Sequence, residues 1–74
     1  MSLYEAKVKA RFQVDCVPEN QLLEHMGLRP GTQLIIQNRY ALGGPVLLRV
    51  EGAYDLALGK DIARQISVKE ADAV

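Results

Sequence analysis

The sequence contains one cysteine, one histidine and no tryptophan. A single cysteine rules out a disulfide within the chain, and with a single histidine it cannot complete a zinc site of four nitrogen and sulfur ligands. No apolar run reaches the ~20 residues of a membrane-spanning helix, and the first residues mix charged with apolar side chains, unlike a signal peptide. Because a lone thiol also suits a reducing compartment, these absences indicate a cytoplasmic protein.

Charge of one sign is also lacking. The nine Lys and Arg residues are balanced by nine Asp and Glu residues, so the formal net charge is zero at pH 7. This balance argues against a nucleic-acid binder with a broad basic face and against a polybasic membrane anchor. With 74 residues, of which 49% are hydrophobic, the chain suffices for one compact domain over residues 1–74.

The clearest periodicity covers residues 4–16, where apolar residues occupy every even position and polar residues every odd position. This alternation predicts one long strand with a buried and an exposed face. It places Phe12 and Cys16 in the core. The exposed face then carries Lys7, Lys9 and Arg11.

A short helix is predicted after this strand, with Pro18 at its first position, where the missing N–H costs nothing. Leu22, Leu23 and Met26 recur at helical spacing and predict its buried face. Gly27 follows as the residue that ends the helix in the left-handed conformation.

Two further turns are predicted from glycine and proline. Pro30 and Gly31 occupy the central positions of a type II turn. Gly43 and Gly44 can both adopt positive φ and predict a tight type I′ hairpin, after which Pro45 begins the returning strand. The remaining strands are predicted over residues 32–40, 46–50, 54–58 and 66–68, with one helical turn over residues 60–64. The predicted fold class is all-β, a small five-stranded barrel with a short helical insertion after the first strand.

Several segments resemble motifs of one family. Residues 26–32 (MGLRPGT) are similar to the lGl.pG element of the FeoA family, ferrous iron transport protein A. Residues 42–46 (LGGPV) resemble its l.GgP hairpin. Residues 56–58, Ala63 and residues 66–68 resemble its closing iaLr...A..I.V segment.

The resemblance spans residues 22–68 and implies an SH3-like β-barrel with a helical insertion. It also implies a cytosolic, non-catalytic accessory protein of bacterial ferrous iron uptake, which binds and modulates the membrane GTPase-transporter FeoB. A related domain is appended to iron-dependent repressors. Residues 4–7 depart from the leader of the form L..l..G with which family members usually open.

Groups able to carry chemistry are sparse. Cys16 and His25 could ligate a metal ion together with Asp15 or Glu24. However, Cys16 falls in the buried phase of its strand, and His25 suits the negative end of a helix dipole. We therefore expect no metal site and no cofactor. Since no hydroxyl or thiol nucleophile has an evident base, we also expect no enzymatic activity.

An exposed apolar surface is the stronger functional hypothesis. Ile35 and Leu47 fall out of phase with the buried positions of the two strands that flank the glycine hairpin, and Leu42 lies in its loop. Together with Gly43 and Gly44 they predict a partner-binding face. The alternative is that the preceding helix covers these residues.

A second class of function is RNA binding or association with the ribosome, as in other small barrels. It needs the basic row of Lys7, Lys9 and Arg11 to join Arg39 or Arg49. The zero net charge disfavours tight electrostatic binding, so we expect no nucleic-acid partner. The sequence leaves the oligomeric state open.

Overall fold

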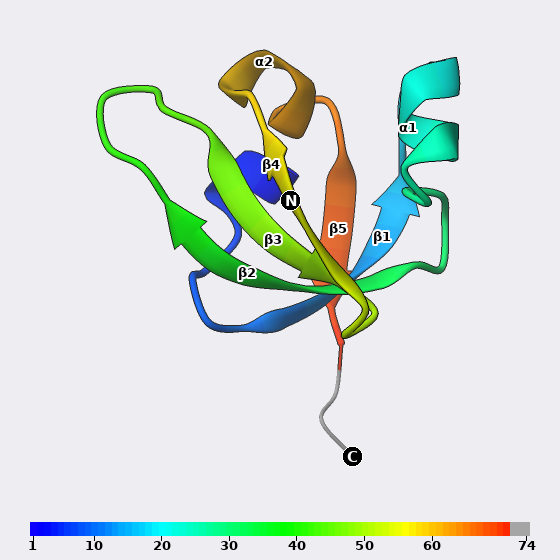
Figure 1. The fold of residues 1–74 in the computed structure, drawn as a ribbon, viewed down its shortest axis with the longest axis horizontal. Coiled ribbons are helices and arrows are strands. Elements are labelled where there is room, and N and C mark those ends of the chain that lie inside the picture. The colour runs from blue at the N-terminus through cyan, green and yellow to red at the C-terminus, as the bar shows by residue number, and fades with distance from the viewer. Residues whose placement is uncertain (72–74) are drawn as a thin grey trace.

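The computed structural model describes residues 1–71, so the last three positions of the expected domain lie outside the described part. Five strands form one antiparallel sheet in the order β4-β3-β2-β1-β5 (Figure 1). The strands are β1 (Arg11–Cys16), β2 (Gln33–Arg39), β3 (Val46–Val50), β4 (Tyr54–Leu58) and β5 (Ser67–Glu70). The five-stranded all-β prediction is therefore confirmed.

Two short helices interrupt the strands. Helix α1 (Gln21–His25) follows β1, and α2 (Lys60–Ala63) connects β4 to β5. Figure 1 shows α1 beside the end of β1, whereas the loop between β2 and β3 extends on the other side of the molecule. Within residues 1–71, no helix has the length and apolar character needed to cross a bilayer.

The inward faces of the strands supply the core by simple alternation. Leu34 and Ile36 on β2 are buried, and so are Val46, Leu48 and Val50 on β3, as a side-chain period of two requires. The buried cluster also contains Leu3, Ala6, Phe12, Val14, Leu23, Leu28, Leu58, Ala63, Ile66 and Val68. Because a domain of this size has a small core, each large member contributes heavily to stability.

The prediction of one strand over residues 4–16 is wrong for its first half. Leu3–Glu5 form a 3-10 turn, and β1 begins only at Arg11. Between them, Lys9 has a φ of +73°, which interrupts the extended backbone and the alternation of side chains. Lys7 and Lys9 therefore do not share a strand face with Arg11.

The segment before β1 resembles the L..l..G leader of the FeoA family, from which residues 4–7 were predicted to depart. Leu3, Ala6 and Lys9 follow the L..l..G spacing; the first two are fully buried, and Lys9, at the place of the glycine, has a left-handed backbone. Arg39 holds the leader against β2, because its Nη1 donates hydrogen bonds to the carbonyls of Tyr4 (3.0 Å) and Ala6 (2.6 Å). The expected departure is thus corrected for the two apolar positions of the leader, whereas a lysine still stands at the position of its glycine.

Cys16 is exposed, which corrects its prediction as a core residue. The pairing of β1 with β5 changes register between Val14 and Cys16. Such a bulge adds one residue to a strand and turns the following side chains to the opposite face. Phe12 and Val14 precede the change in register and are buried, as the alternation predicts.

Helix α1 begins at Gln21 rather than at Pro18. Asn20 caps it, because its side-chain Oδ1 accepts a hydrogen bond of 2.8 Å from the backbone N–H of Leu22, and asparagine is a strongly preferred capping residue. This start turns Leu23 into the core and leaves Leu22 64% exposed. The predicted burial of Leu22 is therefore wrong.

The end of α1 is fixed by backbone geometry. Gly27 has a φ of +82°, and the Leu28 N–H donates to the Leu23 carbonyl at 3.0 Å, as in a Schellman ending. The Tyr54 hydroxyl, from the start of β4, donates to the Met26 carbonyl. A Cβ atom on Gly27 would overlap the Tyr54 hydroxyl oxygen, so this contact needs glycine for space as well as for φ.

The following turn leads the chain into β2. Gly31 has a φ of +97°, and the Thr32 N–H donates to the Arg29 carbonyl at 3.0 Å. This is the geometry of a type II turn with Pro30 and Gly31 at its centre. The buried Thr32 hydroxyl donates to the Gly27 carbonyl at 2.8 Å, which ties the turn to the end of α1.

The turn between β2 and β3 lies one residue earlier than predicted. Leu42 and Gly43 have the two positive φ angles, +60° and +77°, and the Gly44 N–H donates to the Ala41 carbonyl at 3.2 Å. Both features belong to a type I′ turn centred on Leu42 and Gly43. Gly44 instead permits close packing, because a Cβ atom there would lie 2.8 Å from the Cβ of Tyr40.

Candidate protein-docking site

The hairpin tip, defined here as residues 40–44, projects from the ends of β2 and β3 (Figure 1). Leu42 is fully exposed, and Tyr40 is 49% exposed. These exposed apolar side chains on a protruding loop make the tip a candidate surface for a partner. The sequence indicated Leu42 but not Tyr40, whose only signal was its place at the end of a strand before the glycine turn.

Leu42 combines two unfavourable features. Its left-handed backbone favours Gly, Asn or Asp over leucine, and its side chain is fully in water. An equivalent turn joins β3 to β4, where Glu51 and Gly52 have φ angles of +51° and +72°. Glu51, which has the position in that turn that Leu42 has in the hairpin tip, is exposed and polar. Strain stored in an exposed apolar residue is typical of a functional position.

The hairpin tip lies near the first residue of α2. A Cβ atom on Gly43 would lie 3.7 Å from the Lys60 Cδ, so the lysine side chain runs beside the turn. The Lys60 ammonium lies 5.7 Å from the centre of the Tyr4 ring, which is within cation–π distance. The Tyr40 N–H closes the base of the loop with a 3.1 Å hydrogen bond to the Pro45 carbonyl. The tip therefore has a defined orientation on the barrel.

Ile35 and Leu47 lie on the outer face of the sheet, outside the hairpin tip. Both are half-buried. Ile35 is four residues before the end of β2 at Arg39, or about 13 Å at the usual rise of a strand. Ile35 is therefore separated from the tip, whereas Leu47 is the second residue of β3 and lies near the base of the tip. The alternative, that α1 covers the whole surface, does not apply to the exposed Leu42.

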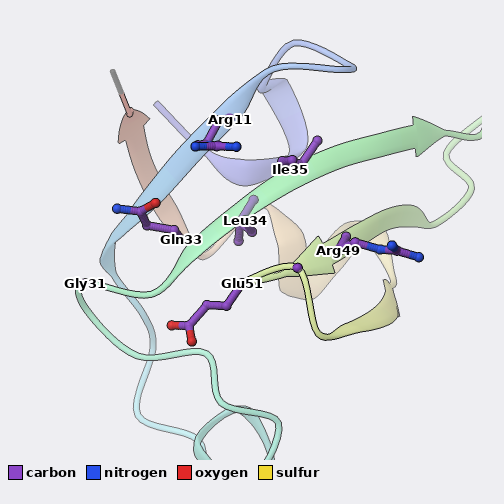
Figure 2. A pocket seen from close by; sticks show the side chains of 8 residues that line it. Arg11, Gly31, Gln33, Leu34, Ile35, Arg49 and Glu51 are labelled. Carbon is purple, nitrogen blue, oxygen red and sulfur yellow. The ribbon is translucent and has the colours of Figure 1, made fainter. Parts of the chain in front are cut away.

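A shallow depression of about 450 Å³ lies next to Ile35 on the outer face of the sheet (Figure 2). The register of the strands that line it places Arg11, Ile35 and Arg49 side by side on β1, β2 and β3. The complete lining is Arg11, Gly31, Gln33, Leu34, Ile35, Arg49, Glu51 and Gly52. Because no aromatic side chain lines it, the depression differs from the grooves with which SH3 domains bind proline-rich peptides.

Within residues 1–71, one salt bridge forms, and it lies on this outer face. The Arg49 Nε and the Asp55 Oδ1 are 2.8 Å apart. The hydrogen bond from Arg49 lowers the pKa of Asp55 below its ordinary value, and the same bond raises the pKa of Arg49. Since both side chains are substantially exposed, the pair contributes little to stability.

Asp55 is consequently a pH probe for this face. We expect its carboxyl to titrate below the midpoint of an unperturbed aspartate, and Arg49→Gln to return the midpoint to the ordinary range. Because the folded-state pKa is the lower one, the small stabilisation is present above the unfolded-state pKa and is lost as pH falls through the folded-state pKa. NMR titration of the side-chain carboxyl carbon measures both midpoints; identical values in the two proteins would contradict the assignment.

The residues considered for metal binding do not form a cluster. Cys16 and His25 are both exposed, on β1 and α1. In the part of the chain that the structure describes, no three His, Cys, Asp or Glu side chains gather in an arrangement able to hold a metal ion. Asp15 and Glu24 thus complete no such group with either residue.

The basic row required for RNA binding is not assembled as predicted. Lys7 and Lys9 precede β1, and the Arg39 guanidinium binds backbone carbonyls of the leader. Arg49 is paired with Asp55. Arg11 and Arg49 line the same depression, but Lys7 and Lys9 do not continue this pair as a row along β1.

The antiparallel order of five strands, the short helices and the projecting hairpin together define a small SH3-like barrel. A family model described as the FeoA domain matches residues 1–70. The chain therefore belongs to the FeoA family, whose members are small domains associated with iron uptake. The match begins at residue 1 and so includes the leader.

Solved structures agree with this assignment. The crystal structure of an iron uptake regulatory protein, FeoA, is 27% identical over 95% of this chain and 94% of that chain, with a TM-score of 0.83. The NMR structure of a FeoA-like protein from Clostridium acetobutylicum is 30% identical over 95% of this chain and 85% of that chain, with a TM-score of 0.80. No curated protein matches the chain in sequence comparison.

The same fold occurs as part of a larger regulator. The manganese-activated repressor ScaR is 28% identical over 96% of this chain, with a TM-score of 0.83. The chain corresponds to only 35% of that repressor. The likeness therefore concerns one domain of ScaR.

Proposed function

We propose that this protein is a non-catalytic accessory factor of bacterial ferrous iron uptake, which binds and modulates a FeoB-like membrane GTPase-transporter from the cytoplasmic side. Its membership of the FeoA family supports the role in iron uptake. The choice of partner follows from the resemblance of its motifs to that family. The observation that carries a binding role is Leu42, which is fully exposed on a left-handed backbone at the hairpin tip.

The energetics favour Leu42 as the anchor of the interface. Transferring an exposed leucine from water into an apolar pocket contributes about 1.5–3 kcal/mol. Tyr40 adds a second apolar surface with a polar hydroxyl, a combination common in interface cores. Because the tip is already fixed by its hydrogen bonds, little conformational entropy is lost on binding. Ile35 and Leu47 lie outside this centre and act as secondary contacts in the proposed interface.

The variant Leu42→Asn tests this proposal with opposite effects on stability and binding. Asparagine tolerates the left-handed backbone, so the free energy of unfolding is expected to rise by about 0.5–1 kcal/mol. Loss of the apolar anchor is expected to weaken binding to the cytosolic domain of the transporter by about thirtyfold, equivalent to ~2 kcal/mol. Calorimetric titration and a urea denaturation curve measure the two quantities.

Glu51→Asn is the matched control, because Glu51 has the same place in the other type I′ turn. In that turn the Ala53 N–H donates to the Val50 carbonyl at 2.9 Å. Asparagine at position 51 should raise the free energy of unfolding by a similar amount. This variant is expected to retain partner binding. An unchanged affinity in Leu42→Asn would exclude the hairpin tip as the anchor, and absence of binding by the unmodified protein would overturn the transporter as partner.

A further inference from the structure

We propose that Lys60 is a positioning residue that links the N-terminal leader to the hairpin tip and so sets the direction in which Leu42 is presented. The inference rests on the proposed function for its consequence in binding. Its structural part concerns this chain alone. The relevant contacts come from three segments far apart in sequence: the leader with Tyr4, the first residue of α2, and the turn at Gly43.

The leader provides a rigid support. Leu3 is fully buried in the core, and its N–H donates to the Ile66 carbonyl at 2.7 Å. Arg39 binds the carbonyl of Tyr4 itself at 3.0 Å. Since the backbone on both sides of Tyr4 is anchored, its half-buried ring has a fixed place beside the barrel.

Lys60 lies between this support and the tip. Its ammonium lies over the Tyr4 ring, 5.7 Å from the centre, and its Cδ lies 3.7 Å from the place that a Cβ atom on Gly43 would take. A lysine stem can pack while its charged end remains partly in water. Because the stem lies beside Gly43, the second central residue of the turn, we expect a change at Lys60 to alter the direction of the neighbouring Leu42, the first central residue.

Without the Lys60 side chain, the hairpin tip would sample several orientations relative to the barrel. If only a fraction of molecules then presents Leu42 correctly, the measured affinity falls by that fraction although the interface itself is unchanged. Ordering a loop at an interface commonly costs enough to weaken binding about three- to tenfold. Lys60 thus affects partner affinity without needing to touch the partner.

The first measurement needs no partner. The Tyr40 N–H and the Gly44 N–H close the base and the turn of the tip by bonding to the carbonyls of Pro45 and Ala41. In Lys60→Ala we expect hydrogen exchange at these two amides to accelerate about tenfold, while exchange in β1 and the melting curve stay unchanged. Lys60→Arg keeps a cation for the ring and is expected to restore protection. Unchanged exchange in Lys60→Ala overturns the proposal.

The second measurement uses the cytosolic domain of the transporter. Lys60→Ala and Tyr4→Leu are each expected to weaken binding about fivefold, whereas Tyr4→Phe, which keeps the ring, and Lys69→Ala, an exposed lysine on β5, leave it unchanged. If exchange accelerates but affinity does not fall, the positioning role is wrong. If the unmodified protein does not bind, the proposed function fails, while the exchange experiment still decides whether Lys60 fixes the tip.

Discussion

Replacing Gly27 with valine is expected to lower the free energy of unfolding by about 3 kcal/mol. A β-branched residue at a φ of +82° is strained by about 1–3 kcal/mol. Its Cβ also displaces the Tyr54 hydroxyl from the Met26 carbonyl, and a lost hydrogen bond costs about another 1 kcal/mol. For a domain of this length, with a total stability of about 4–11 kcal/mol, the variant loses a large share of its stability.

A pair of alanine variants separates strain from overlap in urea denaturation. Gly31 has a φ of +97° and no atom within 4 Å of an added Cβ, so Gly31→Ala reports backbone strain alone. Gly27→Ala reports strain together with overlap at Tyr54. We expect Gly27→Ala to be the more destabilising, and the difference to shrink in a Tyr54→Phe background, which lacks the overlapping oxygen. Equal losses for the two alanine variants would show that the Tyr54 contact has no energetic weight.

The sequence predicted best those features that depend on a few consecutive residues. Gly27 and Leu28 after an apolar helical stretch specify a helix ending because only local backbone geometry is involved. The alternation in β2 and β3 likewise predicted which residues are buried, since each strand has one face toward the core. These local patterns, taken with the family motifs, were sufficient for the five-stranded barrel.

Features that depend on distant residues were missed. The alternation of residues 4–16 contains no sign that Lys9 adopts a positive φ or that Arg39 fastens the leader to β2. Cys16 leaves the core because β1 changes register against β5, a strand near the other end of the chain. In both cases a tertiary contact overrides a pattern that is locally consistent with an extended strand.

The candidate site shows the same division. Leu42 was found because an apolar residue beside two glycines is conspicuous in a loop. Its left-handed backbone was not found, since the turn was placed one residue later, on Gly43 and Gly44. The support from Lys60 was missed as well, because it joins α2 to residues 17 and 56 positions away in the chain. Residue type thus predicted the exposed apolar residue, whereas its backbone conformation and surroundings depend on tertiary structure.

The corrected start of the chain leads to the second large effect. Leu3 is completely buried, so Leu3→Ala is expected to lower the free energy of unfolding by about 2–5 kcal/mol through lost burial and the cavity that remains. Lys7→Ala is the matched control, because Lys7 lies in the same opening segment but its side chain is outside the core. Lys7 is exposed in the structure, and its substitution should change stability by less than about 0.5 kcal/mol. Urea denaturation of the two variants provides the test: a large loss confined to Leu3→Ala requires the leader to be part of the core, whereas similar small effects would show that the leader contributes little to stability.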